Sequence, residues 1–290
     1  MPVVKLDGIE IAYALVGDGQ PWVLTPGGRF TKEVGGLPEM ARALADQGKQ
    51  VLTWDRPNCG ESSVEFRGAS ESEIQADALG ALLRHLDLGP TVIAGGSGGA
   101  RVSLLTAARN PDVTAGLAMW WISGGVPGLL QLANYYCMPS ADAAWHGGME
   151  AVVELEQWQE VLEHNPGNRA RFLSMDRQEF LDVMDRWALA YCPCDDSLVP
   201  GLNDADVAGL DVPILVFHSG ASDMSHTRAT SERLAAGLPG AELVEPPWDD
   251  DEWNERRAEV EQLGSLFVRW PRLVPQLVDW AARTIGGEQE

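Results

Sequence analysis

Short apolar runs alternate with amphipathic stretches along most of the chain, and this alternation predicts strands and helices in turn. Predicted strands cover residues 3–6, 9–16, 21–25, 50–54, 115–122, 213–217 and 241–245, with another that begins at Thr91. Predicted helices cover 39–47, 151–164, 178–189, 227–238, 252–263 and 271–285, with others that begin at the capping pattern of Ser70 and at Gly98 or Gly99. Strands that alternate with helices indicate an α/β fold with a doubly wound, mostly parallel sheet.

The strand rhythm stops between Ser123 and about Leu210. This segment predicts several helices joined by loops rich in proline and glycine. We therefore expect a core formed by residues 1–122 and 211–290, with a helical subdomain at 123–210 inserted into it. Aromatic and methionine side chains are frequent in the insertion, and we expect most to form its core and a few to face an apolar pocket: Tyr135, Tyr136, Met138, Trp145, Met149, Trp158, Met175, Met184, Trp187 and Tyr191.

One glycine-crowded turn carries the strongest chemical signal. Gly95, Ser97 and Gly99 fit the pattern G-x-S-x-G between a predicted strand and a predicted helix. In that setting a tight bend pushes the serine hydroxyl out above the sheet, and the backbone N–H of Gly98 points to where an oxyanion would form. A purely structural strand-to-helix turn is the alternative. A dinucleotide-binding turn fits less well, because a third small residue is missing at Arg101.

Composition narrows the classes of partner. The 290 residues carry a formal net charge of −22, which argues against nucleic acid because phosphates would be repelled. No apolar run reaches the ~20 residues of a membrane span, and the first residues lack the pattern of a signal peptide. Cys192 and Cys194 are too close together for a zinc site. We expect a cytoplasmic protein, monomeric or homodimeric, that acts on a small molecule without a metal or another cofactor.

The order of these features resembles the α/β-hydrolase superfamily, in the subset with a helical cap inserted after the sixth strand, which includes esterases and C–C bond hydrolases. The resemblance spans essentially the whole chain. It rests on the serine turn, on Asp55-Arg56-x-x-x-Gly60-x-Ser62, on Gly220-x-x-Asp223, and on Pro26-Gly27-Gly28, where proline replaces the family's histidine. The resemblance implies that Ser97 is the nucleophile, that Asp223 orients a histidine, and that Gly28 N–H is the second oxyanion donor.

The usual position of the catalytic histidine is not occupied by histidine. The family places it after the last strand, where this chain has Pro246-Pro247-Trp248 or Gly264-Ser265-Leu266, and no histidine follows His226. His226 lies three residues after Asp223, at the sheet edge where catalytic groups gather, so it is our candidate base. A helix-entry residue before Thr227 is the alternative. The acidic run 249–252 is a weaker candidate.

The other histidines fit structural roles: His85, His146 and His164 on surfaces or in loops, and His218 beside a buried strand.

Arg29 follows the Pro26-Gly27-Gly28 turn, which would supply the second oxyanion donor and is called the oxyanion turn below. Arg101 lies one helical turn after Ser97. Either guanidinium could hold a substrate carboxylate or enolate, although Arg101 could equally pair with an acid such as Asp55. Trp121 and Trp248 are further candidates for substrate binding.

The function that these features favour is a serine-dependent hydrolase of an ester, a lactone or an activated C–C bond in a mainly apolar small organic substrate. Two alternatives stay open. One is a non-hydrolytic lyase, isomerase or cyclase that uses the same pocket. The other is a catalytically silent ligand-binding protein on the same fold.

Overall fold

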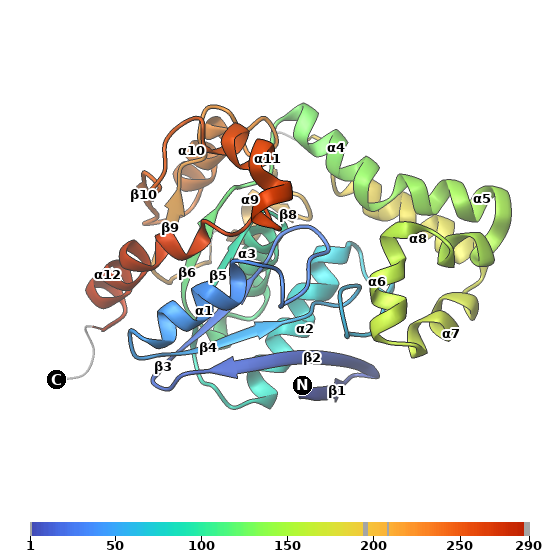
Figure 1. Ribbon diagram of the computed structural model, residues 1–290, viewed down its shortest axis with the longest axis horizontal. Helices are drawn as coiled ribbons and strands as arrows, with labels where there is room; N and C mark the ends of the chain where they lie inside the picture. The colour runs from blue at the N-terminus through green and yellow to red at the C-terminus, as the bar shows by residue number, and fades with distance from the viewer. Residues whose placement is uncertain (1, 194–196, 208, 287–290) are drawn as a thin grey trace.

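The computed structural model describes residues 2–193, 197–207 and 209–286 (Figure 1). Eight strands of this part of the chain form one sheet in the order β1-β2-β4-β3-β5-β6-β9-β10. They are β1 (Val3–Leu6), β2 (Ile9–Val16), β3 (Gln20–Thr25), β4 (Lys49–Trp54), β5 (Thr91–Gly96), β6 (Thr114–Trp120), β9 (Ile214–Phe217) and β10 (Glu242–Val244). The pairs β1–β2 and β2–β4 are antiparallel, and every other neighbouring pair is parallel. The prediction of a mostly parallel, doubly wound sheet is confirmed.

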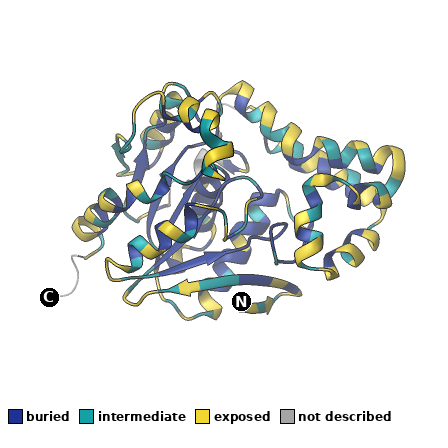
Figure 2. Ribbon diagram, in the orientation of Figure 1, coloured by how far each residue is buried: buried dark blue, intermediate teal, exposed yellow. Residues whose placement is uncertain are grey.

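Helices cover both faces of the sheet. Side chains from α1 (Leu37–Ala45) and α12 (Val274–Thr284) pack on one face, while α2 (Glu71–His85), α3 (Gly98–Arg109) and α10 (Arg228–Gly237) pack on the other. Successive residues of a strand point to opposite faces. Trp22 and Leu24 therefore pack against α1 and α12, whereas Val23 packs in the cluster on the other face. Both faces of the central strands are therefore buried, as Figure 2 shows for the centre of the molecule.

A second group of helices projects from one side of the sheet (Figure 1). It contains α4 (Val126–Tyr136), α5 (Met138–Val153), α6 (Glu156–His164), α7 (Gly167–Leu173) and α8 (Arg177–Leu189). These helices share their own apolar cluster, which includes Trp158, Phe172 and Trp187 and receives Phe66 from the chain before α2. Asn168 ties the group to the chain between β4 and α2, since its amide donates to Ser62 O and its carbonyl accepts from Val64 N.

The helical segment differs from expectation in two places. The helix expected over 151–164 is two helices, because Leu155 is extended, with φ −67° and ψ 134°, and caps the start of α6. The strand rhythm also returns before 210, in a small hairpin of β7 (Ser197–Val199) and β8 (Leu202–Asn203), followed by α9 (Asp204–Val207). Leu198, Leu202 and Leu210 pack in the cluster that contains α10, so these residues contact the sheet-side core. Strands this short give too few alternating positions to predict.

The remaining elements close the fold. The helix α11 (Glu252–Leu263) matches its prediction, and two 3-10 turns cover Pro111–Val113 and Trp270–Leu273. None of the described helices combines the length and apolar character needed to cross a membrane. The described residues hold no group of three or more metal-ligating side chains. Cys194, which is too close to Cys192 in the sequence for a zinc site, lies outside the described residues.

Candidate active site

Ser97 sits on a strained bend between β5 and α3. Its φ of 57° and ψ of −122° lie in a region that residues with a side chain rarely adopt. Hydrogen bonds hold the bend, because Ser97 N donates to Trp120 O over 3.1 Å and the N–H of Ala100 returns to Ser97 O. A Cβ at Gly99 would lie 2.0 Å from Thr25 O, so glycine is required there. The bend leaves Ser97 half-buried at the carboxyl end of the central strand.

His226 contacts Ser97 directly. Its Nε2 lies 2.8 Å from Ser97 Oγ, and its Nδ1 lies 2.8 Å from Asp223 Oδ2. The other carboxylate oxygen of Asp223 accepts from the backbone N–H groups of Ser225 and His226, each over 3.0 Å. Asp223 and His226 are both buried. The three side chains form one continuous hydrogen-bonded chain, the arrangement in which an imidazole can take the proton of a serine hydroxyl.

The helix-entry alternative for His226 is compatible with this contact. Thr227 is the N-cap of α10, and its hydroxyl accepts from Thr230 N over 3.3 Å. His226 therefore precedes the cap, which fixes its backbone while its side chain turns toward Ser97. The other four histidines lie elsewhere: His85, His146 and His164 are exposed, and His218 is half-buried with its Nε2 3.7 Å from Glu245.

Aromatic rings enclose the imidazole. The Trp121 ring stacks on His226 with centroids 6.1 Å apart, and the Trp253 ring meets it edge-on at 5.6 Å. Trp121 is buried, while Trp248 is half-buried and lies 6.2 Å from the Trp121 ring. The structure thus places Trp121 against the base, with Trp248 behind it. Trp248 comes from the loop after β10, where the family has its histidine, and Trp253 comes from the first turn of α11.

A buried guanidinium lies behind the wall. The Arg256 CZ atom is 3.6 Å from the centre of the Trp121 ring and 4.6 Å from that of Trp253. Its ion-pair partner is the buried Glu252, at 3.4 Å. Burial lowers the pKa of Arg256 to about 10, although the charges of Glu252 and Asp223 oppose that shift.

The turn after β3 lies against Ser97. A Cβ at Gly27 would be 2.7 Å from Ser97 Cβ and 3.1 Å from its Oγ, and Gly28 has a φ of 52°. Arg56 holds this turn from behind by donating to the carbonyls of Gly27, Gly28 and Phe30 over 3.2, 2.7 and 3.3 Å. Within the described residues, the N–H groups of Gly28 and Gly98 donate no hydrogen bond, so both can receive an oxyanion.

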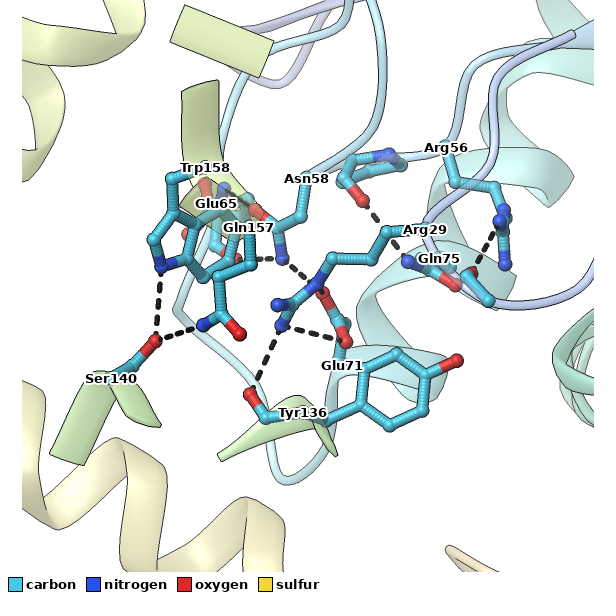
Figure 3. Close-up of polar contacts among 12 residues, drawn as sticks. Arg29, Arg56, Asn58, Glu65, Glu71, Gln75, Tyr136, Ser140, Gln157 and Trp158 are labelled. Atoms are coloured by element: carbon cyan, nitrogen blue, oxygen red, sulfur yellow. Dashed lines mark hydrogen bonds and ion pairs between the residues drawn. The ribbon is translucent and has the colours of Figure 1, made fainter. Parts of the chain in front are cut away.

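The two candidate arginines have protein partners. Arg29 pairs with the buried Glu71 at 3.1 Å and donates to Tyr136 O over 3.2 Å, as Figure 3 shows. Although burial opposes it, the Glu71 carboxylate raises the pKa of Arg29. Arg101 donates to Ser72 Oγ over 2.7 Å and to Tyr191 Oη over 3.2 Å.

The predicted pairing of Arg101 with Asp55 is wrong. Asp55 instead accepts from Lys32 Nζ over 2.8 Å and from the N–H groups of Lys32 and Glu61. The sequence places Asp55 at the end of β4, but the side chain turns toward the loop after β3. A Cβ at Gly60 would lie 2.4 Å from its carboxylate, which explains the glycine in that motif.

Sequence reasoning missed the contributions of Arg56, Arg256 and Tyr136. The position of Arg56 next to Asp55 in the Asp-Arg-x-x-x-Gly turn was a signal, but nothing in the pattern indicated that it binds the oxyanion turn. Arg256 belongs to a charged helix with no apolar stripe, which reads as a solvated surface. Tyr136 is one of many aromatic residues in the helical insertion.

The comparisons with known proteins agree with this architecture. A family model described as alpha/beta hydrolase fold matches residues 24–119. A search of curated proteins finds no significant match.

Solved structures similar to the chain include the enol-lactonase from Burkholderia xenovorans LB400, at 20% identity over 97% of this chain and 100% of that chain, with a TM-score of 0.57. A thermophilic esterase from Thermogutta terrifontis is similar at 23% identity over 94% and 99% of the two chains, with a TM-score of 0.56. Est816, described as an N-acyl homoserine lactone degrading enzyme, is similar at 22% identity over 90% and 98%, with a TM-score of 0.55. At these identities the likeness shows the α/β-hydrolase fold.

Proposed function

We propose that this chain with an α/β-hydrolase fold is a serine hydrolase that cleaves an ester or lactone of a mainly apolar small molecule. The observation that carries the proposal is the hydrogen-bonded chain from Asp223 through His226 to Ser97, with 2.8 Å at each junction. Esterase and lactonase activities in the names of similar structures support the same reaction class.

The mechanism follows from the donors and acceptors of the site. His226 Nε2 accepts the hydroxyl proton as Ser97 Oγ attacks the substrate carbonyl. The Gly28 and Gly98 N–H groups hold the negative charge that develops on the carbonyl oxygen. The imidazolium, paired with Asp223, then protonates the departing alkoxide. A water molecule, deprotonated by His226, hydrolyses the acyl-enzyme and regenerates the serine.

Apolar surface beside the turn supports an apolar substrate. Phe30 and Tyr135 are exposed by 39% and 45%. Their rings approach Gly28, since a Cβ there would lie 2.9 Å from the Phe30 ring and 4.0 Å from Tyr135 Oη. Exposed aromatic side chains next to a reactive group favour the binding of apolar molecules.

The test is turnover of a short-chain aryl ester and labelling by a fluorophosphonate, on the wild type, Ser97→Ala, His226→Ala and the exposed control His146→Ala. We expect both signals in the wild type and in the control, and neither in the two site variants. Turnover that survives in Ser97→Ala would instead favour a lyase, isomerase or cyclase. A wild type with neither signal would contradict the proposal and favour a ligand-binding protein.

A further inference from the structure

The position that a side chain at residue 98 would occupy is surrounded by hydrogen-bond donors. A Cβ built on Gly98 would lie 3.3 Å from Gly28 N, 3.3 Å from Tyr136 Oη and 3.7 Å from Arg101 Nη2. The first of these donors belongs to the oxyanion turn described above. The hydroxyl of Tyr136 therefore reaches the same small volume beside Ser97 as the two proposed backbone donors.

We propose that the Tyr136 hydroxyl is a third donor of the oxyanion hole, supplied by helix α4 rather than by the sheet. This inference rests on the proposed function, because it assigns a further catalytic residue to the same reaction. An oxygen that occupied the volume beside Gly98 would lie within hydrogen-bond distance of Gly28 N and of Tyr136 Oη together.

The tyrosine is held rigidly at both ends. Its carbonyl accepts from Arg29 Nη2 over 3.2 Å (Figure 3), and the same guanidinium lies over the ring, 5.2 Å from its centroid. The ring lies parallel to that of Tyr191, with centroids 5.6 Å apart and an interplanar angle of 6°. Tyr136 is 3% exposed. A donor that is fixed before the reaction contributes more to catalysis than one that must reorganise.

Arg101 gives the surroundings of the hydroxyl a positive charge. Its guanidinium hydrogen-bonds to Ser72, to Tyr191 and to Tyr136 itself, and no described carboxylate lies within 4.0 Å of it, although the charge of the more distant Glu71 helps to raise its pKa against the effect of burial. Its Nη1 is buried and has no partner in the described part of the chain. A buried cation without a contacting carboxylate favours negative charge nearby. Burial raises the pKa of Tyr136, so its hydroxyl keeps the proton that it would donate.

The first test is the second-order rate of fluorophosphonate labelling in the wild type, Tyr136→Phe and Tyr13→Phe. The tetrahedral adduct places an oxygen in the oxyanion hole, so the loss of one donor should slow labelling about 10- to 100-fold. Tyr13→Phe removes a tyrosine hydroxyl on β2, outside the site, and should react at the wild-type rate. Equal rates in the wild type and in Tyr136→Phe would overturn the assignment.

A second variant guards against a structural explanation of that result. Gly98→Ala puts a methyl group at the point between the donors, so it should also slow labelling. If Tyr136 donates into this volume, Gly98→Ala should cost less in the Tyr136→Phe background than alone. Independent, multiplying losses would contradict the proposal, even if Tyr136→Phe were poorly folded on its own.

A separate readout distinguishes failure of this inference from failure of the proposed function. Methylphosphonate binding to the Ser97→Ala protein can be measured by calorimetry and needs no reaction. If wild type is not labelled, the hydrolase proposal fails. A loss of methylphosphonate affinity in Ser97→Ala/Tyr136→Phe would then still support Tyr136 as an anion donor. Unchanged affinity, or no binding to either protein, would overturn it.

Discussion

The Nδ1 atom of His226 lies 2.8 Å from Oδ2 of Asp223, although only two residues separate the acid from the imidazole along the chain. The turn between them is closed by the second carboxylate oxygen, which accepts from the N–H of Ser225 and of His226. One loop after β9 thus holds both groups. The loop after β10, where the resembled family has its histidine, and the start of α11 pack Trp248 and Trp253 around the site instead.

Replacing the acid should separate its two roles. Asp223→Asn keeps an oxygen that can accept from the two backbone N–H groups, but it removes the charge that orients the imidazole. We expect kcat to fall by about 10⁴-fold, with little change in thermal stability. Asp223→Ala should lower stability as well, because the loop N–H groups lose their acceptor. An Asn variant with wild-type kcat would contradict the role of Asp223.

Arg56 should matter for catalysis without touching substrate. Arg56→Met releases the carbonyls of Gly27, Gly28 and Phe30, so the turn that presents Gly28 N–H loses its support. We expect a fall of about 10-fold or more in kcat for the aryl ester, with a much smaller change in KM. The control is Arg42→Met, which removes an exposed arginine paired with Glu39. Equal kcat in both variants would contradict this role.

Asn168 should control how the projecting helices attach to the chain between β4 and α2. Its side chain joins Ser62 O, Val64 N and Val161 O, and it is fully buried. Asn168→Ala leaves these groups unpaired, which should lower the free energy of unfolding by about 2–4 kcal/mol. Urea denaturation measures the loss, and limited proteolysis should cut first near α7. Asn134→Ala, at an exposed position of α4, should have a small effect by comparison.

Removing one partner of the buried ion pair behind the aromatic wall should be costly. Arg256→Met leaves the buried Glu252 with Arg269, at 4.0 Å, as its remaining cation, and the loss of a buried partner typically costs about 3–5 kcal/mol. Burial already raises the pKa of Glu252, so without Arg256 the carboxyl should take up a proton more readily. The double variant Arg256→Met/Glu252→Gln should therefore be more stable than Arg256→Met. Urea denaturation that ranked them in the opposite order would show that the charge of Glu252 is unimportant.

Ionisation of the buried thiols of Cys59 and Cys137 should destabilise the fold at alkaline pH. Burial raises the pKa of both Cys59 and Cys137 to about 12, against about 8.5 for an unfolded thiol. The unfolded chain therefore loses protons first, and the stability that these groups contribute is present below pH ~8.5 and is lost as the pH rises toward 12. Urea denaturation between pH 7 and 10.5 should show this fall, and Cys59→Ala/Cys137→Ala should reduce its slope.

The same thiols provide a direct check in the native state. Cys192 is exposed, whereas Cys59 and Cys137 are buried. A thiol reagent at pH 8 should modify Cys192 quickly and reach Cys59 and Cys137 only after unfolding. Rapid modification of Cys137, identified by peptide mapping, would contradict the packing of α4 against α5.

Local patterns predicted most of the fold because each strand and helix carries its own period. The pair β1 and β2 and the helix α11 begin and end at the residues expected from the sequence. The hairpin β7–β8 was not predicted because strands of two or three residues show no period. The break between α5 and α6 at the extended Leu155 was not predicted because the capping role of this residue depends on the fold rather than on its residue type.

The site was predictable only as far as neighbours in sequence determine it. Ser97 and Asp223 stand in motifs that follow individual strands, so their places at the sheet edge could be inferred. Whether His226 contacts Ser97 depends on how loops 129 residues apart pack, which no local pattern encodes. The contacts of Arg56 with the turn after β3 and the place of the Tyr136 hydroxyl near Gly98 depend on long-range packing in the same way.

The loop that carries both Asp223 and His226 also changes how errors spread through the molecule. When an acid and a base sit on separate loops, a shift of the acid's loop disturbs their contact, and a shift of the base's loop disturbs that contact and the one with the nucleophile. Here the loop's own hydrogen bonds fix the acid against the base. The packing between distant parts of the chain then has to align the base with Ser97 and the turn after β3 with Ser97, but not the acid with the base.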